Sequence, residues 1–379
     1  MSRNISLVVA LTGATLMMNR LAFGQPVRII QDDIPCAAPF FADVDGDGRK
    51  DLLVGQHRDD PSTGARVRLF RNIGTTKVPL FDDGTFLQAG GADASCNEFC
   101  RTGFGPQLVD FNGDGVRDLI TGAPYCQLFV FPGRNAGGFD AANTMAYVTD
   151  KHQASDFHYN VRLFAHDWDS DGDLDLLVPR IRTVWLIRNN GDLKTPQFAL
   201  PVELPETRAE TTYFSAPFVA DWNNDGRDDL ILGRGDGSVV WLQNSAERGA
   251  EPELAPPVIL VEPGVSAMVT RDANGDYDRP AAPTRDIRVC VADYNDDGRL
   301  DLLLGDAWIL TSDNQPSVEQ QERQARHAAF AIDMTEKLEA LQKSPPNETI
   351  EARAAREASI ATQKVICAKA LHAANVADT

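Results

Sequence analysis

The sequence predicts an all-β protein, a β-propeller of about five four-stranded blades followed by a C-terminal α-helical hairpin. Two observations predict the propeller. An acidic motif recurs five times along the chain, and each copy lies between short apolar runs typical of antiparallel strands. A third observation predicts the hairpin: from about Pro316, apolar residues recur at helical spacing on both sides of a Ser-Pro-Pro break.

The acidic motif has the same residue types at the same positions in every copy. Position 1 is Asp, position 3 is Asp or Asn, position 5 is Asp, position 6 is Gly, position 9 is Asp and position 10 is Leu. This agreement indicates one structural unit repeated along the chain. The copies are DVDGDGRKDLL from Asp43, DFNGDGVRDLI from Asp110, DWDSDGDLDLL from Asp167, DWNNDGRDDLI from Asp221 and DYNDDGRLDLL from Asp293.

The segments around each motif predict the strands of a blade. An apolar run such as APFFADV precedes the motif and a second one, such as DLLVGQ, ends it. In the first four copies a third strand follows at once and a weaker fourth comes later, which is the order of a propeller blade. The fifth copy lacks a clear third strand. We therefore expect the ring either to close with the N-terminal PVRIIQDDI, residues 26–34, or to stay incomplete.

The pattern D-x-[DN]-x-D-G-x-x-D-L between two strands resembles the FG-GAP or VCBS repeat of integrin α-subunit propellers and many secreted bacterial proteins. The resemblance covers about residues 36–310. It implies a β-propeller in which this loop joins the first and second strands of a blade and holds calcium.

The residue types of the loop suit calcium in their own right. Alternate carboxylates present oxygens on one side of a turning chain, and Ca²⁺ prefers oxygen ligands in flexible geometry. The alternative is that Asp and Gly only make good turns, but a turn does not require Asp at position 9. The resemblance implies up to five Ca²⁺ ions held by Asp43, Asp45, Asp47 and Asp51; Asp110, Asn112, Asp114 and Asp118; Asp167, Asp169, Asp171 and Asp175; Asp221, Asn223, Asp225 and Asp229; and Asp293, Asn295, Asp297 and Asp301.

Charge and the N-terminus bear on where the protein acts. The formal net charge of −19 would repel a nucleic-acid backbone. Residues 1–24 read as a signal peptide, with Arg3, an apolar stretch and cleavage after Gly24; a retained N-terminal anchor is the alternative. No stretch is long enough to span a membrane. We expect a secreted, periplasmic or cell-surface protein with the propeller at 25–315 and the helical hairpin at 316–379.

Cysteines and aromatic residues give two further expectations. Six cysteines in an exported chain predict one or two structural disulfides, but they allow 15 pairings and the sequence does not choose among them. Position 2 of the motif is aromatic in four of five copies. These side chains are expected to pack between blades, the alternative being a stacking platform for sugars.

No catalytic motif was found, so binding leads the functional hypotheses. The first is a non-enzymatic binding or adhesion scaffold for a protein or glycan at a propeller face. The alternative is a carbohydrate-active enzyme, a polysaccharide lyase or glycosidase, or a lectin on the same propeller. The third is a structural surface protein that self-associates through its C-terminal helices; otherwise the hairpin packs on the propeller.

Overall fold

The chain divides into two units, Arg3–Leu310 and a second that combines Met1–Ser2 with Thr311–Thr379. The predicted helical hairpin at 316–379 falls in the second unit and lies outside the described residues. This computed structural model describes residues 37–57, 64–96, 103–123, 126–147, 162–180, 182–209, 215–247, 249–264 and 285–306, together with the backbone of short strands at 4–5, 8–11, 15–17, 20–22, 27–30, 268–269 and 308–310.

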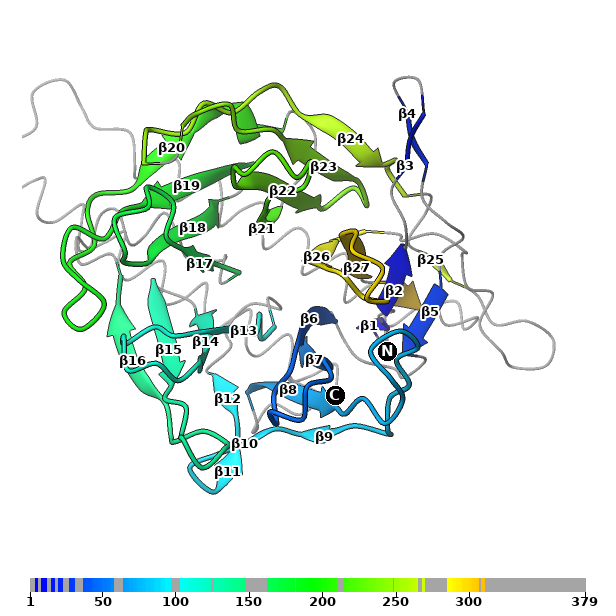
Figure 1. Cartoon of the computed structure of the whole chain (residues 1–379), viewed down its shortest axis with the longest axis vertical. Helices are drawn as coiled ribbons and strands as arrows, with labels where there is room; N and C mark the ends of the chain where they lie inside the picture. The colour runs from blue at the N-terminus through cyan, green and yellow to red at the C-terminus, as the bar shows by residue number, and fades with distance from the viewer. Residues whose placement is uncertain are drawn as a thin grey trace, which may run out of the picture. The chain divides into compact units, whose positions relative to one another are not determined.

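Four antiparallel sheets are arranged as propeller blades, with the first strand of each nearest the centre (Figure 1). The first is β6 (Ala38–Ala42), β7 (Asp51–Gln56) and β8 (Ala65–Phe70), with β9 (Thr85–Phe86) and β12 (Ser95–Cys96) sharing the outer edge. The second is β13 (Gln107–Val109), β14 (Asp118–Ala123), β15 (Gln127–Phe131) and β16 (Asn143–Ala146); the third is β17 (Phe164–His166), β18 (Asp175–Arg180), β19 (Thr183–Ile187) and β20 (Val202–Leu204); the fourth is β21 (Ser215–Ala220), β22 (Asp229–Arg234), β23 (Val239–Leu242) and β24 (Val258–Val261).

A further sheet has the order β26 (Arg288–Ala292), β27 (Asp301–Gly305), β2 (Val8–Leu11) and β5 (Val27–Ile30). Its first strand, β26, packs against both β21 of the fourth blade and β6 of the first. The N-terminal segment predicted to help close the ring thus supplies β5 to this sheet. β2, from the predicted leader, lies between β27 and β5.

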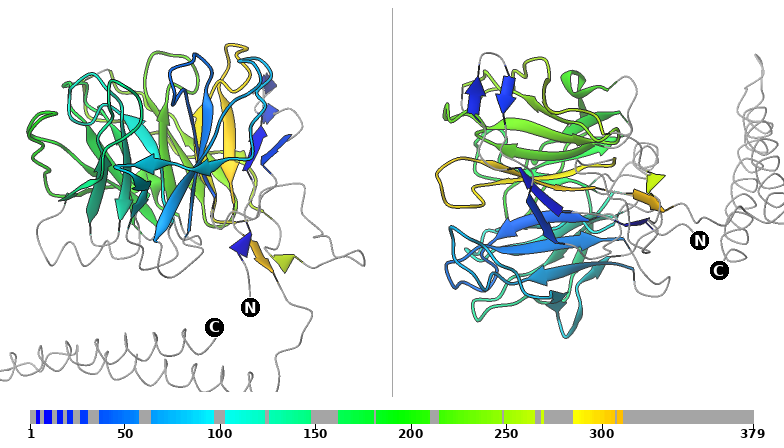
Figure 2. Two further views of the ribbon diagram at one scale, coloured as in Figure 1. Left: turned by 90° about the horizontal axis from the view of Figure 1, so that it is seen from below. Right: turned by 90° about the vertical axis from the view of Figure 1, so that its right-hand side faces the viewer.

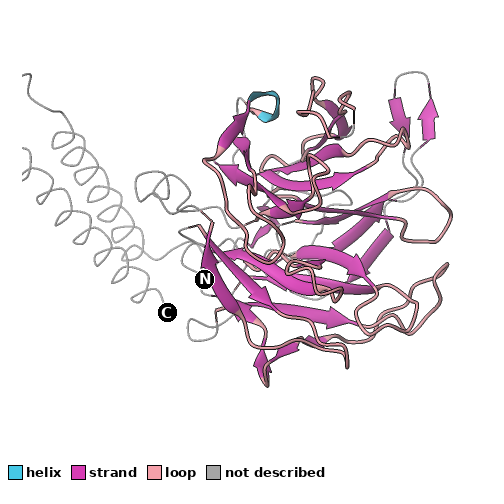
Figure 3. Ribbon diagram, turned by 60° about the vertical axis from the view of Figure 1, so that its left-hand side comes forward, coloured by secondary structure: helices cyan, strands magenta, loops and turns pink. Residues whose placement is uncertain are grey.

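The remaining elements are short, and the described part of the chain is all-β as predicted (Figure 3). The one helical element among the described residues is a single 3-10 turn, η2 (Pro205–Thr207). The other strands are β1 (Asn4–Ile5), β25 (Met268–Val269) and β28 (Trp308–Leu310) in one sheet, the β3 (Thr15–Met17) and β4 (Arg20–Ala22) hairpin, and the β10 (Gln88–Ala89) and β11 (Ala92–Asp93) hairpin.

The register of each blade follows from the motif. The last residue of the first strand pairs with the Asp at position 9, as in Ala42 with Asp51 and Ala292 with Asp301. The second strand that starts at this Asp is almost wholly buried, which explains its continuous apolar run. Because the pairing is the same in all five copies, motif positions 1 to 8 form a loop at the same end of every sheet.

Aromatic residues fill the space between the inner strands. The rings of Phe164 and Phe218 have centroids 4.6 Å apart, and Phe40 lies 6.4 Å from Phe218. Between the second and third blades, the Gln107 amide takes the place of an aromatic ring: its Nε2 donates to Ala165 O, and its Oε1 accepts from Ala165 N. The centre is therefore packed with side chains from several blades.

The motif's position-2 aromatics pack in the core, as the sequence predicts. Phe111 and Trp168 are buried, while Trp222 and Tyr294 are half-buried against the main apolar cluster. Position 2 thus contributes to packing in the core.

The structure tests the disulfide prediction only in part. Cys290 is a buried thiol, and burial raises its pKa to about 12. Cys96 and Cys126 are also buried. The other three cysteines lie outside the described residues, so their pairing stays a prediction.

Adjacent blades approach each other closely at a glycine of the second strand. A Cβ on Gly55 would lie 1.9 Å from Phe104 O, the carbonyl that precedes the second blade. A Cβ on Gly233 would meet Ile287 O at 2.4 Å, and one on Gly305 would meet Ala37 O at 2.1 Å. Only glycine allows this approach. The contact between Gly305 and Ala37 joins the β26–β27 sheet to the first blade.

Candidate metal loops

The five motif loops lie on the same side of the sheets (Figure 2). Hydrogen bonds join the first loop to the second and to the fifth. Arg117, at position 8 of the second loop, donates to the backbone carbonyl of Asp43 in the first loop. Lys50 Nζ of the first loop lies 3.3 Å from the carbonyl of Asp293 in the fifth. The fifth, first and second acidic loops are thus linked to one another.

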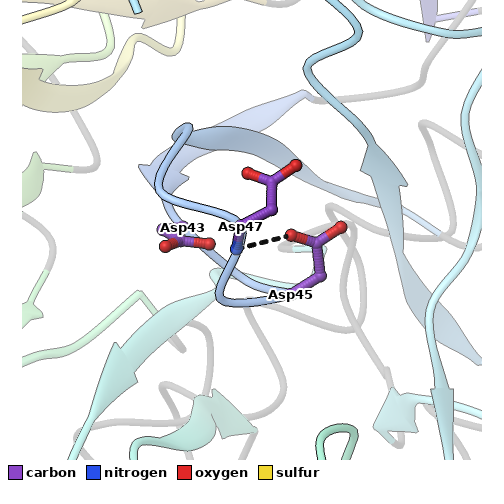
Figure 4. Close-up of side chains that lie close together, drawn as sticks. All are labelled: Asp43, Asp45 and Asp47. Carbon is purple, nitrogen blue, oxygen red and sulfur yellow. Dashed lines mark hydrogen bonds between the residues drawn. The ribbon is translucent and has the colours of Figure 1, made fainter.

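The first loop is shaped by bonds between its carboxylates and its own backbone. Asp43 accepts from the N–H groups of Gly46, at 2.7 Å, and Gly48, at 3.0 Å. Asp45 Oδ1 accepts from Asp47 N at 3.2 Å, the bond dashed in Figure 4. Each of the three Asp side chains offers an oxygen within 4.8 Å of the others. The loop therefore gathers three carboxylates without help from the rest of the protein.

The same bonds recur in the other loops with one exception. The position-1 carboxylate accepts from the position-6 glycine N–H in all five loops. Position 3 accepts from the N–H of position 5 in the first, second, fourth and fifth loops. In the third loop, Oδ1 of Asp167 and Oδ1 of Asp169 are buried, with no hydrogen-bond partner within the described residues. These two oxygens of the third loop are therefore available to a cation.

The Asp at position 9 is held differently from the other predicted ligands. Asp51 is 1% exposed; its Oδ2 accepts from Val44 N at 3.2 Å and its Oδ1 from Asn72 N at 2.9 Å. Asp118 likewise accepts from Phe111 N and Gly133 N. Position 9 therefore ties the start of the loop to the end of the third strand, whatever else its oxygens bind.

Sequence reasoning missed the residue that completes this link. Asn72 ends the third strand of the first blade, and Asn189 and Asn244 do so in the third and fourth. The side-chain oxygen of Asn72 also accepts from Gly74 N and Leu80 N, which fixes the outer turn. An Asn preceded by Arg or Gln, which follows the third strand in the first, third and fourth blades, is the sequence signal that marks it.

Burial and crowding raise carboxyl pKa values, most of all in the third loop. Burial raises the pKa of Asp51, Asp118 and Asp229. Burial, with the nearby Asp171, Asp169 and Asp167 carboxylates adding to it, raises the pKa of Asp173 to about 6. Burial is also the largest cause that raises the pKa of Asp175 to about 6. These carboxylates are costly to keep ionised without a cation.

The donor set fits a hard cation. Positions 1, 3 and 5 supply carboxylate and amide oxygens and no nitrogen or sulfur, which suits calcium better than zinc. The three side chains at these positions come together in the first and third loops. A bound Ca²⁺ would supply the positive charge that the crowded carboxylates lack. The residues that would hold it are those at positions 1, 3 and 5, with position 9 behind them.

Comparison with known families agrees with the repeat. A family model described as FG-GAP-like repeat matches residues 43–121 and 167–232. The chain therefore contains FG-GAP-like repeats in these two segments. The matched segments of this FG-GAP-like protein include the first four acidic loops. No curated protein matches the chain in sequence.

Three solved structures show limited likeness to the FG-GAP-like chain. An Agrocybe aegerita lectin that recognises non-reducing terminal N-acetylglucosamine has a TM-score of 0.36 at 18% identity, covering 80% of this chain and 71% of its own. The Photorhabdus luminescens Tc holotoxin pore has a TM-score of 0.33 at 15% identity, covering 79% of this chain and 13% of its own. The exotype rhamnogalacturonan lyase YesX has a TM-score of 0.28 at 12% identity, covering 66% of this chain and 60% of its own.

Likeness at this level indicates no function for the chain. Within the described residues, no helix has the length and apolar character needed to cross a membrane.

Proposed function

We propose that the chain is an exported, calcium-stabilised propeller of five blades that serves as a non-enzymatic binding or adhesion scaffold. The observation that carries the proposal is the repeated loop. Backbone N–H groups hold the carboxylates at position 1 and position 5 in all five loops. The carboxylates of such a loop repel one another when no cation is bound, and a bound cation stabilises the folded protein.

The sheet of β26 and β27 is the fifth blade in this proposal. Three contacts of one kind support it: Gly55 against Phe104, Gly233 against Ile287, and Gly305 against Ala37. The first two join consecutive blades along the chain. The third repeats the same geometry between the last sheet and the first, as expected of a closed ring.

Export is compatible with this closure. Cleavage after Gly24 would remove β2 from the fifth sheet but would keep β5, β26 and β27. The contacts that join this sheet to its neighbours come from β26 and β27, so they do not depend on the leader. Intact-mass measurement of the exported protein would show whether residues 1–24 are removed.

Calcium removal tests the stabilising role directly. At a free calcium concentration one hundred times Kd, each occupied loop adds about 2.7 kcal/mol to the free energy of unfolding. Chelation with EDTA is therefore expected to lower Tm by several degrees, and added Ca²⁺ is expected to restore it. Thermal melts across a calcium titration measure this, with Mg²⁺ as the control cation. An unchanged Tm throughout the titration would contradict the proposal.

The partner is expected to be a protein or glycan bound at a face of the ring. A glycan array and pull-down on cell-surface protein, each with calcium and with EDTA, measure binding. Incubation with pectin-like polymers tests the enzymatic alternative, because a lyase releases unsaturated sugar products. Binding without turnover supports the scaffold, whereas unsaturated products would replace it with an enzyme.

A further inference from the structure

The third loop differs from its four counterparts in having an acidic residue at position 7. That position is Asp173 in the third loop and Arg49, Val116, Arg227 or Arg299 in the others. In a loop that offers the backbone carbonyl of position 7 to a cation, the side chain there is free to vary. The Asp173 side chain does not point into open solvent, because the residue is only 6% exposed.

Four buried carboxylate oxygens of this loop lack a hydrogen-bond partner within the described residues. They belong to four different Asp residues, at positions 1, 3, 7 and 9: Asp167 Oδ1, Asp169 Oδ1, Asp173 Oδ1 and Asp175 Oδ2. In the first loop the matching oxygens accept backbone N–H groups, from Gly46 to position 1, from Asp47 to position 3 and from Val44 to position 9. Buried carboxylate oxygens left unpaired are strongly unfavourable unless a cation binds them.

Among the described residues, Arg188 pairs with this group on one side, and Lys194 lines the same pocket as Asp171 and Asp173. Arg188 donates through Nη1 to Asp169 Oδ2, and its Nη2 is 2.6 Å from Glu251 Oε2. This ion pair occupies Oδ2 of Asp169. The Oδ1 of Asp169 has no hydrogen-bond partner within the described residues. Asp173 lies close enough to Asp171, Asp169 and Asp167 for their charges to act on it, and the Asn189 side chain hydrogen-bonds to it.

We propose that the third loop is the tightest cation site of the ring and that the Asp173 carboxylate is an additional ligand that makes it so. This inference rests on the proposed calcium-binding function and names the loop that fills first. A fifth carboxylate raises the charge of the site, and ligand charge is one of the two factors that set calcium affinity in oxygen sites.

Tryptophan-sensitised Tb³⁺ luminescence on the full chain tests the inference. Trp168 lies between two ligands of the third loop, and Trp222 holds the same position in the fourth. A Trp222→Phe, Trp241→Phe background removes both sensitisers beside the fourth loop, because Trp241 lies beside the position-9 carboxylate of that loop. Excitation at the long-wavelength edge of tryptophan absorption leaves out Tyr294 of the fifth loop, so that emission reports the third loop. In that background Asp173→Asn is expected to weaken Tb³⁺ binding about tenfold or more, because it removes one ligand charge at nearly unchanged size.

The matched control is Asp140→Asn, which removes the same charge from an exposed residue of the second blade. It should leave the third-loop affinity unchanged. A second measurement separates ligation from a structural role. Asp173→Asn should raise Tm in EDTA, because it removes a buried negative charge that is crowded by other carboxylates, and it should lower the Tm gain on adding Ca²⁺.

Equal Tb³⁺ affinity in Asp173→Asn and its parent, or a lower Tm in EDTA, would overturn the inference. Failure of the proposed function gives a different result: isothermal titration of the unmodified protein would then detect no Ca²⁺ binding at any loop. Calcium binding with five indistinguishable affinities would leave the proposed function intact and overturn only the special place of the third loop.

Discussion

Asp51→Ala is expected to destabilise the protein by about 3 kcal/mol in calcium and in EDTA alike, because two backbone N–H groups lose their acceptor. Asn72 N is 2.9 Å from Asp51 Oδ1 and Val44 N is 3.2 Å from its Oδ2. Asp51 is buried, so water does not readily replace the carboxylate. Urea unfolding of the variant and the parent, each with and without Ca²⁺, measures the change.

Asp47→Ala in the same loop provides the contrast. The Asp47 side chain is 31% exposed and accepts from Arg49 N within its own loop. Loss of the Asp47 carboxylate should change the free energy of unfolding little in EDTA. It should reduce the stabilisation that calcium adds by the contribution of one loop. If Asp51→Ala loses stability only in calcium, as Asp47→Ala is expected to, position 9 is a ligand without a separate structural role.

The contrast explains how far the sequence could predict the site. Position 9 is Asp in every copy. A carboxylate that binds a metal and one that accepts hydrogen bonds from buried backbone N–H groups give the same pattern in the sequence. From the sequence, the Asp residues at position 9 are interpreted only as metal ligands. The partners that show the second, Asn72 and Gly133, lie 21 and 15 residues further along the chain. Their proximity depends on the pairing of the second and third strands.

The fold was more accessible to sequence reasoning than the site. The repeated order of apolar run, acidic loop and apolar run fixes both the strands and their register, because Asp51 and its counterparts must start the second strand. Pairing between strands that are distant in the sequence is harder to predict from the sequence. The segment at 26–34 is expected either to help close the ring or to leave it incomplete; it supplies β5 to the sheet of β26 and β27, and ring closure stays a proposal. The pairing of β2 with β27 was not predicted, since residues 8–11 read as part of an export signal.

Differences among the five loops were also hard to predict. Position 7 is Arg in three loops, Val in one and Asp in the third, and it is expected to offer only its backbone carbonyl. The burial of Asp173 depends on the packing of the third loop against Asn189 and the neighbouring carboxylates. Sequence therefore predicts that the loops exist, whereas the structure distinguishes them.

Gly305→Ala is expected to destabilise the protein by about 3 kcal/mol, because the new Cβ would lie 2.1 Å from Ala37 O and 2.8 Å from Ala37 C. Backbone atoms cannot rotate away, so the fifth sheet and the first blade would have to separate. Gly55→Ala makes the same overlap between the first and second blades, with Phe104 O at 1.9 Å. Urea unfolding compares the two variants.

Gly105→Ala is the matched control, because its nearest neighbour would be Arg162 Cα at an ordinary 3.8 Å. A change of less than about 1 kcal/mol is expected there. A ring closed between the fifth sheet and the first blade requires Gly305→Ala to cost about as much as Gly55→Ala. If only Gly55→Ala is destabilising, the fifth sheet does not press on the first blade and the ring is open at that junction. The acidic loops of the first and fifth blades would then lose their connection through Lys50, whose Nζ is 3.3 Å from Asp293 O.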